Sequence, residues 1–261
     1  MGVLNITPDS FSDGGRFTSL GSAVQHAAAM TDGGADVIDV GGESTRPGAE
    51  PVPSAVEIGR VVPVIAEIVR SRPRTLVCVD TSKPEVAAAA LVAGASLVND
   101  VSAARDPRML KVAVEHGAGM ILMHMRGEPR TMQSDTAYAD VVGEVHEFLA
   151  GRAETAVAAG IPRARILLDP GIGFGKDLEG NLRLLAALPD LEALGYAVVV
   201  GASRKAFIGA LASNAGTASR LPGSLAAIAG TVCLPRVVVR VHDVPETVQF
   251  LAVLTALAGA A

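Results

Sequence analysis

Four times along the chain, a glycine is followed by a short run of apolar residues, and the run ends at polar side chains. The four segments are residues 34–39, 94–100, 117–124 and 195–203. Glycine is favoured just after the C-terminus of a helix, and a short continuous apolar run is typical of a parallel strand that is buried on both faces. The pattern predicts repeated helix–strand units in which the C-terminal end of each strand carries polar groups.

Strand-like and helix-like segments alternate along the whole chain. Strands are predicted near residues 2–6, 36–41, 75–80, 96–101, 119–124, 165–169, 197–202 and 236–242. Helices are predicted near residues 19–33, 54–71, 84–94, 107–116, 138–160, 178–194, 204–212 with 220–233, and 244–258. Eight such units in 261 residues match the usual size of one barrel, so residues 1–261 are expected to form a single α/β domain, a (β/α)8 TIM barrel. An open doubly wound sheet is disfavoured because no glycine-rich dinucleotide motif follows the first strand.

Two predicted helices begin at residues that are typical of helix caps. Asp106 precedes Pro107, which combines an N-cap side chain with proline at the first helical position. Ser82 and Glu85 have the spacing of a capping box. Both patterns support the predicted starts of these helices.

Two connections are too long to be simple turns. Residues 7–19 follow the first predicted strand and residues 42–53 follow the second, and both segments are rich in glycine, proline and serine. Both leave from the end of the sheet where TIM barrels carry their active sites, and loops of this length often cover a site. We expect these long loops after strands 1 and 2 to be lids; a plain surface loop is the alternative.

Charge and composition limit the possible partners. The net charge of −5 and the lack of any lysine or arginine cluster argue against nucleic acid and anionic membranes. No apolar stretch reaches the roughly 18 residues that a membrane span needs. Cys78 and Cys233 lie far apart and are expected to be two buried free thiols rather than a disulfide. No basic region precedes an apolar stretch at the N-terminus, so we expect a cytoplasmic protein.

Polar side chains end several predicted strands. Asp80, Asn99 and Asp169 each follow an apolar run, and His124 and His242 end two other strands. An ionised carboxylate can accept two parallel N–H bonds, a geometry that suits a guanidine-like ring edge as well as arginine. Each residue alone could be a helix cap or a solvated strand end. Together, at one edge of the sheet, they predict a binding site.

Cationic side chains follow the last two predicted strands. Arg240 and His242 are separated by one residue, so both are expected on the same face of the strand. Lys205 lies just past the seventh strand. Barrels often bind phosphate near strands 7 and 8, so these residues indicate an anion site. An ion pair between Arg240 and a neighbouring carboxylate is the alternative.

Two further residues are candidates for the same site. Asn5 ends the first strand, and its amide oxygen is a possible Mg²⁺ ligand beside diphosphate oxygens, since Mg²⁺ usually takes few protein ligands. Phe174 lies in the glycine-rich segment 169–176, which is similar to a phosphate-binding loop but lacks the spacing of a P-loop. We interpret the segment as a turn that places Phe174 against a planar ring.

A set of short motifs resembles, in order and spacing, those of the dihydropteroate synthases, the folate-pathway family that sulfonamides target. The motifs are MGVLNITPDSFSDGG (1–15), DVGGESTRPG (39–48), DTSKP (80–84), ND (99–100), MHMR (123–126), DPG (169–171), SRK (203–205) and RVHD (240–243). The resemblance covers essentially the whole chain. It implies a TIM-barrel transferase that joins 6-hydroxymethyl-7,8-dihydropterin diphosphate to 4-aminobenzoate and releases diphosphate, using Mg²⁺. It also implies a homodimer formed through the last helices.

The resemblance assigns roles to residues of this sequence. By analogy, the pterin is held by Asp80, Asn99, Asp169 and Lys205. The diphosphate is held by Thr45, Arg240 and His242, with Mg²⁺ on Asn5. The 4-aminobenzoate site is formed by Asp9, Phe11, Arg46, Pro47, Phe174 and Ser203. The groups expected to act in a dissociative substitution are Asp80, Asp169, Lys205, Arg240 and His242.

Two other functions are compatible with parts of this pattern. A pterin-binding methyltransferase barrel would share the carboxylates, but it would not need the anion-binding residues at 203–205 and 240–242. A catalytically silent paralogue would bind a pterin or a protein partner only. The presence of every expected site residue argues against the silent paralogue.

Overall fold

Eight short apolar segments form parallel strands that pair in the order of the sequence. The strands are β1 (Gly2–Asn5), β2 (Val37–Gly41), β3 (Leu76–Asp80), β4 (Leu97–Asp100), β5 (Gly119–Met123), β6 (Ile166–Asp169), β7 (Ala197–Val200) and β8 (Val237–Val239). In this computed structural model, which describes residues 1–6, 19–45 and 48–260, a parallel bridge links Gly2 of β1 to Val241, just beyond β8. The Val241 carbonyl accepts from Val3 N–H, and Val241 N–H donates to Met1, both at 2.9 Å. These bonds join the two edges of the curled sheet, in agreement with the expected barrel.

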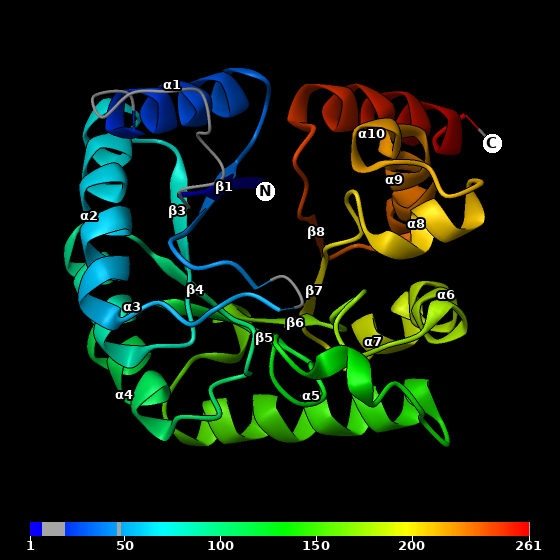
Figure 1. Cartoon of the computed structure of the whole chain (residues 1–261), viewed down its shortest axis with the longest axis horizontal. Coiled ribbons are helices and arrows are strands. Elements are labelled where there is room, and N and C mark those ends of the chain that lie inside the picture. The colour runs from blue at the N-terminus through cyan, green and yellow to red at the C-terminus, as the bar shows by residue number, and fades with distance from the viewer. Residues whose placement is uncertain (7–18, 46–47, 261) are drawn as a thin grey trace.

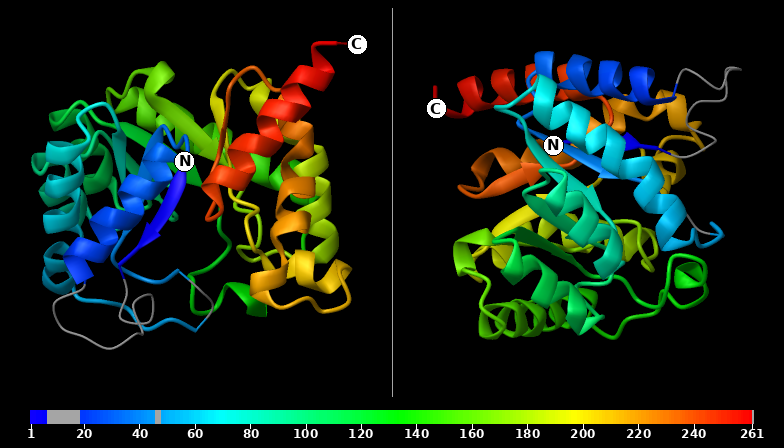
Figure 2. Two further views of the ribbon diagram at one scale, coloured as in Figure 1. Left: turned by 90° about the horizontal axis from the view of Figure 1, so that it is seen from above. Right: turned by 90° about the vertical axis from the view of Figure 1, so that its left-hand side faces the viewer.

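The helices lie around the outside of the strands (Figure 1). They are α1 (Ser19–Asp32), α2 (Ser54–Ser71), α3 (Pro84–Val92), α4 (Pro107–Glu115), α5 (Val141–Ala158), α6 (Leu178–Ala186), α7 (Leu188–Glu192), α8 (Ala206–Leu211), α9 (Leu221–Ile228) and α10 (Val244–Ala258). The first and last helices lie next to each other at one side of the molecule (Figures 1 and 2). There Gly34, at the end of α1, faces Val248 of α10 at a distance that leaves little room for a side chain. The two ends of the chain therefore meet in the helical layer as well as in the sheet.

Buried apolar side chains hold the strands on both faces. A small cluster of Met1, Cys78, Ile121 and Val199 joins residues from β1 through β8. The main core packs the other strand residues against the helices. Because apolar side chains fill both faces of the strands, the polar strand ends are the places where chemistry can be exposed.

Several local expectations need correction. The segment 178–194 forms two helices rather than one, since Pro189 lies in the first turn of α7 and the break falls at Ala187. A proline inside a continuous helix would remove a hydrogen bond, so the chain starts a new helix instead. Cys78 is buried as expected, but Cys233 is exposed, in the 3₁₀ turn Ala229–Cys233 that ends the second helical segment.

The cap predictions had opposite outcomes. The side chain of Asp106 accepts a hydrogen bond from Arg108 N–H at the start of α4, as expected. The capping box at Ser82 is wrong, because the N-cap of α3 is Lys83 and no side chain caps that helix. A neighbouring side chain bonds the backbone here instead: the Thr81 hydroxyl oxygen accepts from Lys83 N–H at 3.2 Å.

The two long connections are only partly described. Residues 42–45 and 48–53, between β2 and α2, form no helix or strand. Residues 7–18 lie outside the described residues, so the lid assignments stay predictions. Among the described residues, no helix has the length and hydropathy needed to cross a membrane.

The turn after β6 requires glycine at position 171. Gly171 has φ of +68°, and a Cβ at this position would overlap the carbonyl oxygen of His124. Gly48 also has positive φ, +79°, but no described atom lies within 4 Å of the place where its Cβ would be.

We therefore expect Gly171→Ala to lower the free energy of unfolding by about 3 kcal/mol, since backbone strain and steric overlap add. Gly48→Ala carries only the backbone strain and should cost about 1 kcal/mol. Urea unfolding of both variants measures the difference. Equal losses would contradict the steric argument.

Candidate active site

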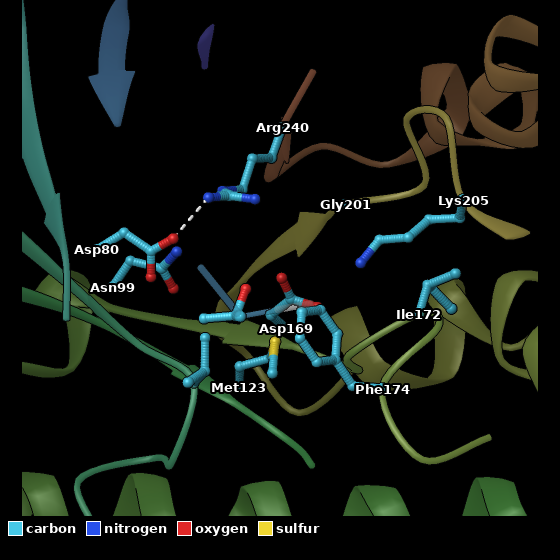
Figure 3. Close-up of a pocket in the computed structure, with 11 residues that line it drawn as sticks. Asp80, Asn99, Met123, Asp169, Ile172, Phe174, Gly201, Lys205 and Arg240 are labelled. Atoms are coloured by element: carbon cyan, nitrogen blue, oxygen red, sulfur yellow. Dashed lines mark hydrogen bonds and ion pairs between the residues drawn. The ribbon is translucent and has the colours of Figure 1, made fainter. Parts of the chain in front are cut away.

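A pocket lies at the C-terminal end of the strands (Figure 3). The lining residues are Thr45, Asp80, Asn99, Val101, Met123, Asp169, Ile172, Phe174, Gly201, Lys205 and Arg240. All four residues predicted for the pterin line one cavity, together with Phe174 and with Thr45 and Arg240 of the residues predicted for the diphosphate.

Arg240 is the centre of a buried charge cluster. Its Nε donates to Asp39 Oδ2 at 2.6 Å, and its Nη2 donates to Asp80 Oδ2 at 2.8 Å. Figure 3 shows the guanidinium reaching toward Asp80 from the end of β8. The ion pair considered as an alternative for Arg240 is thus present, and it lies inside the predicted site. Arg240 itself follows β8, which ends at Val239, three residues earlier than expected.

Burial and mutual charge shift the titration of this cluster. Burial, and next the charge of Asp39, raise the pKa of Asp80, while Arg240 opposes that rise. Burial lowers the pKa of Arg240, but the charges of Asp39 and Asp80 outweigh it and raise the pKa overall. One guanidinium therefore serves two buried carboxyl groups, and Asp80, whose pKa rises to about 7, titrates near neutral pH.

Asp39 was not among the predicted site residues, although it lies within a buried strand. Its side chain is fully buried, and besides Arg240 it accepts from Asn99 Nδ2 at 3.2 Å. Because Asp39 takes the amide N–H, the other amide atom of Asn99, Oδ1, is left buried and without a partner among the described residues. Asn99 thus has a hydrogen-bond acceptor available to a ligand. A lone carboxylate between apolar residues of a predicted strand is the signal that could have identified Asp39.

Asp169 is fixed by the turn that follows it. Its Oδ1 accepts from Gly171 N–H at 2.7 Å, while Oδ2 lies near Gly201, which also lines the pocket. Burial raises the pKa of Asp169, and the Gly171 bond, Arg240 and Lys205 act against that rise. One carboxylate oxygen is therefore used by the backbone and the other is available to a ligand.

A buried lysine that the sequence analysis did not single out holds this turn. Lys176 Nζ lies 3.0 Å from His124 Nδ1 and donates to the carbonyl oxygens of Gly171 and Phe174 at 3.0 and 2.9 Å. Burial lowers the pKa of Lys176 to about 7, against the effect of Asp169. Burial and next Lys176 lower the pKa of His124 to about 3. His124 thus contacts Lys176 and does not line the pocket, contrary to the expectation for this strand end.

Lys205 reaches the pocket from the start of α8. Its Nζ lies 3.9 Å from the ring centroid of Phe174, and the two side chains approach each other in Figure 3. Burial and the charge of Arg240 lower the pKa of Lys205 to about 8, while Asp169 acts in the opposite direction. The group is a cation near neutral pH that a bound anion would stabilise further.

His242 and Ser203 form a pair next to Arg240 and Lys205 in sequence. The Ser203 hydroxyl oxygen accepts from His242 N–H at 3.2 Å and lies 3.0 Å from His242 Nδ1. The hydroxyl can donate to Nδ1 or accept from it, since its oxygen has two lone pairs, and the direction depends on the ring tautomer. Burial, and next Arg204, lower the pKa of His242 to about 4. The imidazole of His242 is therefore neutral at neutral pH. Neither residue lines the pocket.

Asn5 lies at the same end of the sheet, beside Asp80. Its Oδ1 and Asp80 Oδ2 are 3.5 and 3.6 Å from the point where a Cβ of Gly41 would lie, so both oxygens lie close to the same point. The described residues contain no group of three His, Cys, Asp or Glu that could hold a metal. A Mg²⁺ ion here would have Asn5 as its protein ligand and would need substrate oxygens or water for the rest, which fits the usual habit of this ion.

Four candidates cannot be placed. Asp9 and Phe11, and also Arg46 and Pro47, lie outside the described residues. Their assignment to a 4-aminobenzoate site stays a prediction. Of the two members of that set that the structure describes, Phe174 lines the pocket and Ser203 does not.

The comparisons with known proteins agree with this site. The family described as "Pterin binding enzyme" matches residues 1–242. A dihydropteroate synthase of Escherichia coli strain K12 is 45% identical over 260 residues, which are 100% of this chain and 92% of that protein. Xanthomonas albilineans dihydropteroate synthase with 4-aminobenzoic acid is 45% identical with a TM-score of 0.93, and the match covers 99% of this chain and 92% of that one. The same enzyme in complex with 7,8-dihydropteroate is 42% identical with a TM-score of 0.88 over the same shares. This chain belongs to the dihydropteroate synthase family of pterin-binding enzymes.

Proposed function

We propose that the protein is a cytoplasmic dihydropteroate synthase. It transfers the pterin methylene group of 6-hydroxymethyl-7,8-dihydropterin diphosphate to the amino nitrogen of 4-aminobenzoate. One observation carries the proposal beyond family membership: residues from separate strand ends place two buried carboxylates and two cations around one pocket. A pterin diphosphate needs both kinds of group: its ring edge is rich in N–H donors, which carboxylates accept from, and its leaving group is an anion, which cations bind.

The carboxylate side of the pocket suits the pterin ring. Asp169 Oδ2 is available to the 2-amino group and the adjacent ring N–H, while its other oxygen is fixed by Gly171. Asn99 Oδ1 supplies a second buried acceptor. Buried acceptors that stay unpaired without the right ring discriminate strongly against other ligands.

The cationic side suits the diphosphate. Lys205 and Arg240 line the pocket together with Thr45, and His242 contributes an N–H donor close by. Diphosphate bound to Arg240 competes with Asp80 for Nη2, whereas the bond to Asp39 can remain. When bound on Asn5, Mg²⁺ would neutralise part of the diphosphate charge.

The chemistry is a dissociative substitution. The bond between the methylene carbon and the diphosphate oxygen breaks with both electrons passing to oxygen, which leaves a methylene cation delocalised into the ring. Asp80 and Asp169 stabilise that cation by charge, and Arg240 stabilises the departing anion. The nitrogen of 4-aminobenzoate then forms the new bond to carbon and loses one proton to solvent, so no strong base is needed. In this proposal, the connections 7–18 and 42–53 cover the site, complete the 4-aminobenzoate pocket and exclude water.

The direct test is an assay of the purified protein with the pterin diphosphate, 4-aminobenzoate and Mg²⁺. We expect 7,8-dihydropteroate and diphosphate in equal amounts, detected by chromatography. A methyltransferase or a silent pterin-binding paralogue would give neither. Folded protein that forms no dihydropteroate would refute the proposal.

Two variants separate the two halves of the site. Asp169→Asn can keep the Gly171 bond through its oxygen, but it turns an N–H₂ group toward the pocket, so binding of the pterin diphosphate and of the alcohol lacking phosphates should both fall at least about tenfold. Arg240→Ala should weaken binding of the diphosphate at least about tenfold more than binding of the alcohol. Calorimetric titration with both ligands measures the four affinities. An equal loss for both ligands in Arg240→Ala would contradict the role of this residue.

We also propose that the protein is a homodimer formed through α8 and α10. Exposed apolar side chains support it: Leu211 of α8 is 58% exposed, and Val253 and Leu257 of α10 are 56% and 64% exposed. Light scattering should give twice the mass of the chain, and Val253→Glu with Leu257→Glu should give a monomer. A monomeric unmodified protein would exclude this arrangement.

A further inference from the structure

The connection between β2 and α2 carries Thr45 into the pocket, and both of its ends are tied to one side chain outside the pocket. That side chain is Lys83, at the start of α3. Its Nζ forms an ion pair with Glu43, at the beginning of the connection, and donates to the carbonyl oxygen of Val52, near its end, at 2.6 Å. Neither Glu43 nor Lys83 lines the pocket, and the proposed chemistry uses neither.

A third residue fixes Lys83 itself. Glu57, on α2, accepts from Lys83 Nζ at 2.5 Å through Oε2. Its side chain is fully buried, and its Oε1 has no partner among the described residues. A buried carboxylate of this kind lowers the stability of the fold unless a positive charge stays beside it, so Lys83 is held next to Glu57. Burial lowers the pKa of Lys83, but bonds with Glu43 and Glu57 outweigh it and raise the pKa, so the ammonium stays charged.

The beginning and the end of the connection are also joined to each other and to α2. Glu43 Oε1 accepts from Val52 N–H at 3.3 Å. Arg60 of α2 donates to the carbonyl oxygen of Gly42 at 2.7 Å, and a Cβ on Gly42 would come within 2.9 Å of Glu57. The connection therefore packs against α2 where it leaves β2. Val52, nine residues after Glu43, then contacts the same Lys83 ammonium group.

We propose that Lys83, Glu43 and Glu57 form a loop clamp that holds the connection 42–53 in the shape that binds 4-aminobenzoate. They are positioning residues, since none of them lines the pocket. The proposal rests on the proposed function, in which this connection completes the second-substrate site. The pterin groups Asp169 and Asn99 are fixed by residues outside the clamp. The charge of Glu57 also reaches Asp80, whose pKa it helps to raise.

The test compares variants of the full-length protein. Lys83→Met removes the clamp but leaves Glu57 as a buried unpaired carboxylate, which can unfold the protein. The double variant Lys83→Met with Glu57→Gln removes that charge as well and is the main test. Arg70→Met is the matched control: it removes an ion pair with Glu67 on the same helix, where Arg70 is 74% exposed.

Hydrogen exchange followed by mass spectrometry reports on the connection without any substrate. We expect exchange in peptides from residues 42–53 to become at least about tenfold faster in the double variant, with the strands unchanged. Arg70→Met should leave these peptides as they are. Unchanged exchange at 42–53, or an equal increase over the whole chain, would overturn the clamp.

Enzyme kinetics test whether the clamp affects binding of 4-aminobenzoate. In the double variant, KM for 4-aminobenzoate should rise at least about tenfold, while the affinity for the pterin alcohol stays within about twofold. An unchanged KM, or an equal loss of both affinities, would overturn the link between the clamp and the second substrate. If the unmodified protein forms no dihydropteroate, the proposed function fails, and the exchange experiment still decides whether the clamp holds the connection.

Discussion

The shared guanidinium of Arg240 is the interaction on which the rest of the site depends. Arg240 follows the last strand, whereas its partners Asp39 and Asp80 belong to β2 and β3. The two bonds run across the inside of the curled sheet, close to the place where β1 meets the end of β8. Within the described residues, that meeting is a single parallel bridge, in contrast to the continuous ladders between the other neighbouring strands. The buried ion cluster therefore adds a link between the two ends of the sheet.

The same cluster determines the chemistry of the pocket. Asp39 and Asp80 share the guanidinium of Arg240, and Lys205 adds a second positive charge to the pocket. Each polar group is also oriented by a neighbour: Asp39 holds Asn99, Gly171 holds Asp169, and Ser203 holds His242. Acceptors and donors are thus arranged before any ligand arrives, which reduces the cost of ordering them on binding.

Sequence reasoning predicted the strands and the polar residues at their ends, because both depend on local patterns. Asp80, Asn99 and Asp169 each end a short apolar run, and Lys205 comes five residues after β7, so their common position follows from parallel strand order. It did not find Asp39, Lys176 or Lys83, whose importance comes from partners far away in the chain. Asp39 and Arg240 are 201 residues apart, Lys176 and His124 are 52 apart, and Lys83 and Glu43 are 40 apart. A local sequence pattern cannot identify a partner that lies so far away in the chain. The break at Pro189 was readable locally, and the prediction of one helix there gave too little weight to the proline.

Arg240 contributes both to stability and to ligand binding, and its two hydrogen bonds differ in these roles. The Nε bond to Asp39 lies behind the pocket, on a carboxylate with no exposed surface, so it can persist in every state of the enzyme. The Nη2 bond to Asp80 faces the cavity, where a diphosphate would compete for it. An arginine can serve both purposes because its donors point in fixed, separate directions, which a lysine ammonium could not do.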